Sequence, residues 1–144
     1  MVCADDFGLD EAVNAAVERA SREGILTCAS LMVGAPASAD AVARARRLPR
    51  LGVGLHLNLV EGAPVLPPET VPDILDSSGR FDENLARAGW RFFFGRRARR
   101  QLAAEIHAQF AAFRATGLAL DHVNAHRHMH LHPTVAELIL AVGR

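Results

Sequence analysis

Two largely apolar runs constrain the fold of this chain more than any other feature of its sequence. Residues 25–33 and 51–59 contain no Asp, Glu or Arg, which is typical of strands buried on both faces of a parallel sheet. A shorter helix, capped by Ser38 or Asp40, is expected between them. Before them, residues 11–23 predict a helix capped by Asp10, with an inner face of Ala12, Val13, Ala16, Val17 and Ala20.

The second half of the chain continues this alternation of elements. Residues 61–80 contain four prolines and few periodic apolar residues, which predicts a long loop. A long helix is expected over residues 97–116, then a strand over 118–124 and a helix over 133–142 that begins at Pro133. The aromatic side chains expected to anchor the segment before the long helix are Trp90, Phe92, Phe93 and Phe94.

The long helix has a clear division between apolar and charged positions. Its predicted inward residues are Leu102, Ile106, Phe110 and Phe113. Its first turns carry the arginines of a solvated face, at positions 96, 97, 99 and 100. A phosphate-binding or nucleic-acid role is the less favoured interpretation of these arginines.

The order of elements predicts an α/β fold of parallel βα units with right-handed crossovers and helices outside the sheet. The 144 residues are enough for a single α/β domain, residues 1–144, with a real core. The fold is therefore about half of a (β/α) TIM-like barrel or a small open sheet.

Composition excludes several classes of protein. The formal net charge is zero, so nothing overall indicates a nucleic-acid or membrane-surface binder. All sixteen basic residues are Arg, and the lack of Lys excludes Schiff-base lysine chemistry and a Walker-type phosphate loop. No stretch approaches the ~20 apolar residues of a membrane span, and no signal-peptide pattern opens the chain, so a cytoplasmic protein is expected.

Five of the seven histidines lie in residues 121–133. Four of them recur at every second position, and in an extended strand such residues share one face. Neutral imidazole is a good ligand for zinc, nickel, cobalt and iron, so the pattern predicts a metal site at the end of a strand. The alternative is a histidine-rich surface loop that meets metal only by accident. The four alternating histidines are His126, His128, His130 and His132.

Polar residues also follow the first and third predicted strands. Asp5 and Asp6 come after the first strand, and His56 and Asn58 lie near the end of the third. Because the carboxyl ends of parallel strands meet at one edge of a sheet, these residues and the histidine stretch are expected to converge. The alternatives are that the two aspartates only cap the next helix and that His56 is a satisfied core histidine.

The predicted convergence has a specific chemistry. One carboxylate with two imidazoles is a common divalent-metal set that leaves positions open for water and substrate. A second carboxylate beside it can act as a general base. Such a site would polarise a carbonyl group and activate water, which is the chemistry of amide or ester hydrolysis.

Three ordered motifs resemble the YdjC-like carbohydrate deacetylase family. They are Ala4-Asp5-Asp6-Phe7-Gly8, Gly54-Leu55-His56-Leu57-Asn58-Leu59 and Asn124-Ala125-His126-Arg127-His128-Met129-His130. Residues 91–134 look most similar to the hopanoid-biosynthesis-associated members. The resemblance spans nearly the whole chain, which looks like an N-terminal portion of such a protein.

The resemblance implies a (β/α)-barrel-like fold and metal-dependent removal of an N-acetyl group from an amino sugar or glycolipid, in hopanoid lipid biosynthesis for the most similar members. It implies Asp5 as the catalytic base. Zinc or magnesium is the expected divalent ion, and cobalt, nickel or manganese is compatible. The implied metal ligands are Asp6, His56 and His126. The implied pocket or supporting residues are Asn58, Asn124, His128 and His130.

The sequence departs from the family pattern in two ways. Asn124 stands where many relatives have an aspartate, and an amide cannot act as a base. Family members are also usually longer, with a histidine proposed as general acid in their C-terminal half, so the chain looks like an N-terminal portion without that acid. Half a barrel leaves apolar surface uncovered, so a homodimer completed by self-association is expected.

Two alternative functions stay open at this point. The chain could be a non-catalytic metal-binding α/β fragment, because the catalytic acid is missing. It could also belong to the NodB-type polysaccharide deacetylases, which use two histidines in an H-x-x-x-H pattern. Here that spacing occurs only inside the histidine stretch, for the pairs His122/His126, His126/His130 and His128/His132.

Overall fold

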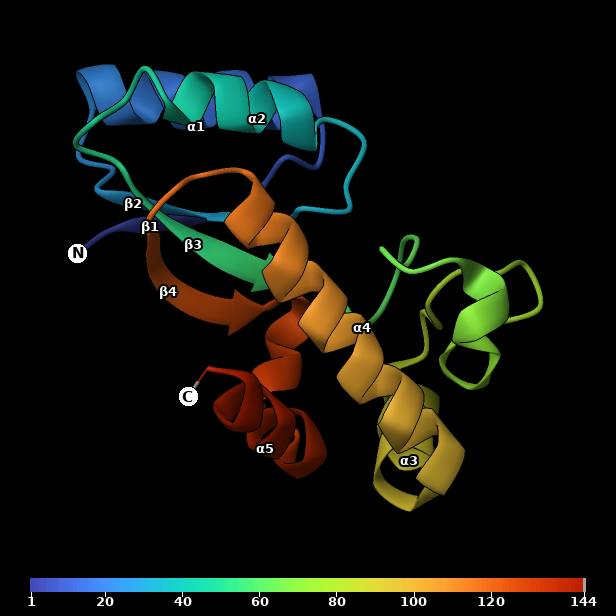
Figure 1. Ribbon diagram of the computed structural model, residues 1–144. Coiled ribbons are helices and arrows are strands. Elements are labelled where there is room, and N and C mark those ends of the chain that lie inside the picture. The colour runs from blue at the N-terminus through green and yellow to red at the C-terminus, as the bar shows by residue number, and fades with distance from the viewer. Residues whose placement is uncertain (144) are drawn as a thin grey trace. The chain divides into compact units, whose positions relative to one another are not determined.

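A four-stranded parallel sheet forms the centre of the fold in the computed structural model, which describes residues 1–143 (Figure 1). The strands follow one another in chain order across the sheet, as expected for parallel strands joined through helices. The predicted parallel α/β fold is therefore confirmed. The strands are β1 (Cys3–Phe7), β2 (Cys28–Leu31), β3 (Gly52–Leu57) and β4 (Leu120–Ala125).

Five α-helices connect and follow these strands, and their limits lie close to those expected from the sequence. Asp10 caps the first helix, since its carboxylate accepts a 2.7 Å hydrogen bond from the Val13 amide. The predicted cap of the second helix is wrong, because Ala37 occupies the capping position and provides no side-chain bond. The helices are α1 (Glu11–Glu23), α2 (Ser38–Ala45), α3 (Leu85–Phe94), α4 (Arg96–Ala115) and α5 (Pro133–Val142).

None of the described helices combines the length and the apolar character needed to cross a membrane. The chain groups into two compact units. The first comprises Met1–Leu57 with Ala111–Asn124, and the second comprises Asn58–Phe110 with the chain from Ala125 onward. The expectation of one domain over residues 1–144 stays a prediction.

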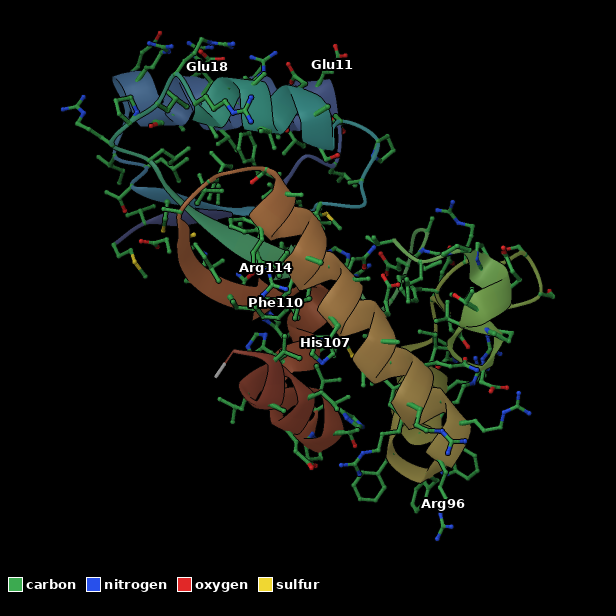
Figure 2. All side chains as sticks on the ribbon, viewed as in Figure 1. Glu11, Glu18, Arg96, His107, Phe110 and Arg114 are labelled. Atoms are coloured by element: carbon green, nitrogen blue, oxygen red, sulfur yellow. The ribbon has the colours of Figure 1, made fainter. Side chains whose placement is uncertain are left out.

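In the first unit, α1 and α2 lie side by side over one face of the sheet (Figure 1). Figure 2 shows Glu11 and Glu18 projecting from α1 on the side away from the strands. Glu18 accepts a 2.8 Å bond from Arg44 of α2, so an ion pair joins the two helices. Of the predicted inner face of α1, only Val17 is fully buried.

A buried asparagine of α1 makes contacts with the turn after β1 and with the start of α2 that the apolar pattern did not predict. The Asn14 side chain accepts a 2.7 Å bond from the Gly8 amide and donates bonds to the Ala37 carbonyl and to Asp40. Because every polar atom of a fully buried amide needs a partner, this network fixes the turn after β1 against the start of α2. This network could not be predicted from the pattern, since a polar residue on a helix is normally solvated.

The second unit contains the long loop that the prolines predicted. Two short 3-10 segments, Pro68–Thr70 and Pro72–Ile74, interrupt it, and an isolated antiparallel bridge pairs Leu75 with Phe81. The inward residues predicted for α4 are all buried, which confirms that face. The predicted aromatic anchor of α3 is mostly wrong, because only Phe92 is buried.

Glu105 of α4 is completely buried, and its hydrogen bonds connect this loop to the helix. Its carboxylate accepts bonds of 2.8 and 3.0 Å from the Val65 and Leu66 amides and one of 2.8 Å from Gln109. Gln109 in turn exchanges two bonds with the backbone of Asn58, at 2.9 and 2.7 Å. A buried carboxylate is tolerated here because fixed donors replace the lost water.

We predict that Glu105→Ala lowers the free energy of unfolding by about 3 kcal/mol, because two buried loop amides and the Gln109 side chain would lose their acceptor. Urea denaturation followed by circular dichroism measures this. The control is Glu137→Ala, whose carboxylate is exposed and bonded to Arg99, and which should cost less than about 1 kcal/mol. Equal effects of the two variants would contradict the assigned role of Glu105.

Candidate metal and catalytic site

The two aspartates lie in β1 itself and not in the turn after it. The pairing of β1 with β2 shifts between Ala4 and Phe7, which marks an irregularity at Asp5 and Asp6. Asp6 has a φ of 61°, in the left-handed region that few residues other than glycine adopt. This strained backbone points successive carboxylates in directions that a regular strand would not allow, and such strain is common at functional sites.

A chain of hydrogen bonds joins three strands at the carboxyl edge of the sheet. Asn124 of β4 donates from Nδ2 to Asp5 Oδ1 at 2.7 Å. Because a carboxylate only accepts, the amide orientation is fixed, and Asn124 Oδ1 faces His56 Nδ1 at 2.6 Å. His56 must therefore carry its proton on Nδ1. The sequence interpretation of Asn124 as a pocket or supporting residue is consistent with this position.

This proton position determines what the other nitrogen of His56 can do. With its proton on Nδ1, the neutral ring has a lone pair on Nε2, whereas the imidazolium would donate from Nε2, and this atom lies 3.2 Å from Asp6 Oδ1. His56 is 2% exposed, so bulk water contributes little at this contact. The contact is favourable when a proton on Nε2 or a cation lies between the two atoms. The pair thus has the donor chemistry and the electrostatics of a cation site.

His126 follows directly after β4, two residues beyond Asn124. Its Nε2 lies 3.4 Å from Glu61 Oε2, and Arg127 donates to the other oxygen of the same carboxylate at 2.9 Å. Burial raises the pKa of Glu61, but its bonds with Arg127 and His126 outweigh this and hold the pKa below its ordinary value. An ionised carboxylate behind an imidazole is a common support for a metal ligand.

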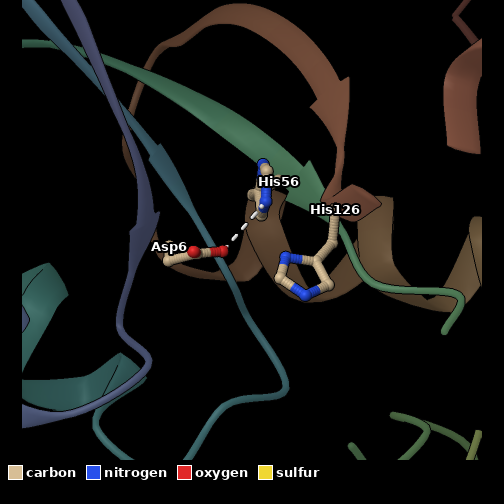
Figure 3. Close-up of side chains that lie close together, drawn as sticks. All are labelled: Asp6, His56 and His126. Carbon is tan, nitrogen blue, oxygen red and sulfur yellow. Dashed lines mark ion pairs between the residues drawn. The ribbon is translucent and has the colours of Figure 1, made fainter. Parts of the chain in front are cut away.

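The structure brings the three predicted metal ligands together (Figure 3). One potential ligand atom from each of Asp6, His56 and His126 lies within 4.8 Å of the others. Asp5 lies beside them, with Oδ1 at 3.7 Å from His56 Nδ1. The predicted convergence of β1, β3 and β4 at one edge is thus observed, and the metal-ligand role of His56 stays a prediction.

The extended strand predicted for the alternating histidines is wrong. Residues His126–Leu131 form a 3-10 segment in which Arg127 and His128 have φ of 52° and 55°. The alternation therefore does not place the four imidazoles on one face. His128 is exposed and contacts the His130 ring edge-on, with centroids 5.8 Å apart. Their predicted pocket role stays a prediction.

Asn58 and His132 are held by structural contacts. Asn58 donates to the Glu61 carbonyl at 2.8 Å, which shapes the turn that presents Glu61. His132 bonds the Gly89 carbonyl at 3.0 Å and packs edge-on against Phe92. The pocket role predicted for Asn58 stays a prediction. Glu61 was missed, because a single glutamate in a proline-rich loop has no distinguishing pattern.

A second polar cluster lies in the same unit as β1 and β3. His122 donates from Nδ1 to Asp121 and accepts at Nε2 from Ser30, both at 2.9 Å. Its ring occupies the space over Gly54, where a Cβ atom would lie 2.5 Å from it. The Asp–His–Ser hydrogen-bonding arrangement resembles that of a serine hydrolase. Ser30 is completely buried, however, so no substrate reaches its hydroxyl.

Known proteins resemble this chain in sequence and in fold. A family model described as YdjC-like protein matches residues 1–144. Carbohydrate deacetylases from Brevibacillus brevis and Vibrio cholerae are 39% and 36% identical over 143 residues, which is 99% and 98% of this chain. These matches cover 54% and 53% of those proteins, so the chain spans about half the length of the curated relatives it matches.

A solved structure resembles this chain over its whole length. It is a protein from Enterococcus faecalis V583, provisionally assigned as a cellobiose-phosphate cleavage protein, with a TM-score of 0.89 and 28% identity. The match covers 100% of this chain and 54% of that one. The four-stranded sheet with its helices is therefore a recurring arrangement that corresponds to part of a longer barrel-like fold.

The bond between His56 and Asn124 gives a spectroscopic prediction. We expect ¹H–¹⁵N correlation spectra of the histidine side chains to show His56 with its proton on Nδ1. Asn124→Leu removes both amide bonds at nearly constant volume, so the spectra should show a mixture of tautomers. The unpaired Nδ1–H should lower the free energy of unfolding by about 2 kcal/mol. A neutral His56 ring with its proton on Nε2 and none on Nδ1 would contradict the hydrogen-bond chain.

Proposed function

Because the chain belongs to the YdjC-like protein family, we propose that it is the metal-binding portion of a carbohydrate deacetylase. The reaction is hydrolysis of an N-acetyl group on an amino sugar or glycolipid. One observation carries this proposal, namely the convergence of Asp6, His56 and His126 beside a second carboxylate. The deacetylase names of the relatives support the reaction class.

The residues fit a divalent cation. They provide one carboxylate and two imidazoles, and a cation near His56 Nε2 and Asp6 Oδ1 would stabilise their 3.2 Å contact, as a proton on Nε2 also would. Both imidazoles are oriented by a further polar group, His56 by Asn124 and His126 by Glu61. When bound, the ion would polarise the acetyl carbonyl and lower the pKa of a water molecule. Zinc and magnesium are the proposed ions.

Asp5 is the proposed general base. Its side chain is half exposed, so a water molecule can reach it, whereas His56 is almost completely buried. The Asn124 amide donates to Oδ1, which holds the carboxylate in place and leaves Oδ2 to accept a proton from the attacking water. A neutral amide suits this position, because a second carboxylate there would repel Asp5.

The proposed substrate is an N-acetylated sugar, and the resemblance of residues 91–134 to hopanoid-associated relatives favours a glycolipid. The relatives named as carbohydrate deacetylases extend well beyond the half that this chain matches. The competing proposal is therefore a metal-binding α/β module without turnover. The homodimer expected from the sequence also stays a prediction.

We expect the purified chain to bind about one divalent ion, measured by elemental analysis after dialysis and by calorimetric titration. Asp6→Asn and His126→Ala should weaken binding by more than the roughly 10- to 100-fold that loss of a supporting residue costs. Asparagine is chosen for position 6 because it tolerates the left-handed backbone. The control is His107→Ala, an exposed histidine on α4 (Figure 2), which should leave the affinity unchanged. A metal affinity that is unchanged in both ligand variants would overturn the assigned site.

Turnover distinguishes the deacetylase from the metal-binding module. The metal-loaded chain should release acetate from oligomers of N-acetylglucosamine, and Asp5→Asn should lower kcat by about 100- to 10,000-fold while the metal content stays constant. A lower kcat at constant metal content distinguishes the general base from the metal ligands. Full metal occupancy without acetate release would favour the metal-binding module, and undiminished turnover in Asp5→Asn would remove Asp5 from the mechanism.

A further inference from the structure

An exposed aromatic and arginine surface lies where α3 meets α4. Trp90, Phe93 and Phe94 of α3 are 68%, 54% and 63% exposed. Arg96 and Arg100 are exposed in the first two turns of α4, directly after Gly95. We call these residues the aromatic–arginine corner. Three large aromatic side chains in five residues are an unusual amount of apolar surface to leave in water.

The exposure of these rings results from an ordered arrangement. The Trp90 and Phe94 rings lie 5.2 Å apart, and the Phe93 and Phe94 rings lie 4.9 Å apart, so they form one continuous apolar surface. Phe92 on the other side of α3 is buried and packs against His132. His132 also contacts the Phe93 ring edge-on, with centroids 6.2 Å apart, but Phe93, Phe94 and Trp90 each stay more than half exposed within the described chain.

The charges beside the rings favour an anionic partner. α4 begins with Arg96, Arg97, Arg99 and Arg100 and has no acidic residue in its first turn, although a helix N-terminus prefers negative charge. Arg97 pairs with Asp73 at 3.2 Å and Arg99 with Glu137 at 2.6 Å. Among the described residues, no salt bridge involves Arg96 or Arg100, and Figure 2 shows Arg96 projecting from the start of α4.

A hollow of about 610 Å3 adjoins the same corner. It is lined by Arg91, Gly95, Arg96 and Arg97 together with Asp73 and Leu75, among others. Arg91 is held by a 3.0 Å bond to the Leu75 carbonyl, and Asp73 is matched by Arg97. The guanidinium groups therefore outnumber the acids, and a phosphate group is of a size and charge that this hollow can hold.

We propose that the aromatic–arginine corner docks the protein on the surface of an anionic lipid bilayer. Tryptophan and phenylalanine favour the boundary between headgroups and acyl chains, and adjacent arginines bind the lipid phosphates. The formal net charge of zero conceals this property, because the positive charge is local and the compensating acids are distributed along the chain. The docking surface does not depend on the proposed deacetylase chemistry.

The chain carries its own reporter for this surface, since Trp90 is its only tryptophan. Trp90 emission is recorded with vesicles of phosphatidylcholine alone and with vesicles containing about a third phosphatidylglycerol. We expect a blue shift, quenching by brominated acyl chains and co-sedimentation with the anionic vesicles, each weakened by salt.

Variants test both components of the surface. Arg96→Gln with Arg100→Gln removes two charges that have no acidic partner, and binding should weaken about 25-fold because each basic residue near an anionic surface contributes roughly fivefold. Phe93→Ser with Phe94→Ser should abolish the blue shift of Trp90. The matched controls are Arg50→Gln with Arg114→Gln and Ile25→Ser with Leu131→Ser, which alter equally exposed residues outside the corner.

The outcomes separate the bilayer from other partners of the same chemistry. Loss of binding in the corner variants only, with circular dichroism unchanged, supports the proposal. A spectral shift with inorganic phosphate or glycerol phosphate alone, or with soluble N-acetylglucosamine oligomers, would overturn it in favour of a small-ligand site. Trp90 already shielded from acrylamide in the free protein would overturn it too, because another copy of the chain would then cover the rings. If all variants bind the anionic vesicles equally, the aromatic–arginine corner is not the docking surface.

Discussion

The hydrogen bond between His56 and Asn124 is the contact on which the candidate site depends. It joins β3 to β4 at the edge where the strands end, and through the Asn124 amide it also joins β1. Because Asp5 can only accept, the amide has one orientation, and His56 then has one tautomer. The direction of the Nε2 lone pair follows from these two constraints. An unbonded asparagine would leave the ring free to flip and the site without a defined ligand.

Backbone strain is concentrated at the same location. Four of the non-glycine residues among positions 1–143 have positive φ. Three of them, Asp6, Arg127 and His128, are a proposed ligand or lie within two residues of one. The fourth is Glu61, whose carboxylate supports His126. Such conformations cost of order 1–3 kcal/mol each and persist only when the surrounding fold holds them. The buried Glu105 and Gln109 network provides this support for the loop that begins at Asn58.

Two kinds of surface thus occur in one small chain. The sheet edge presents carboxylate and imidazole groups that can bind a cation. The aromatic–arginine corner presents guanidinium groups and aromatic rings, which favour an anionic, partly apolar partner. Both arise from local arrangements that the net charge does not reveal. Electrostatic function here is a matter of where charges lie and which of them already have partners.

The sequence by itself determined the alternation of strands and helices, since largely apolar runs and 3.6-residue periodicity depend only on neighbours along the chain. It also determined that Asp5, Asp6, His56 and the histidine stretch would meet, because parallel strands end at one edge. Tertiary structure decided the rest. His126–Leu131 could not be recognised as a 3-10 segment, since period 2 alone favours a strand and only the left-handed Arg127 and His128 break it. The roles of Asn14, Glu61 and Glu105 rest on partners distant in sequence, and the exposure of Trp90 depends on which face of α3 the fold covers.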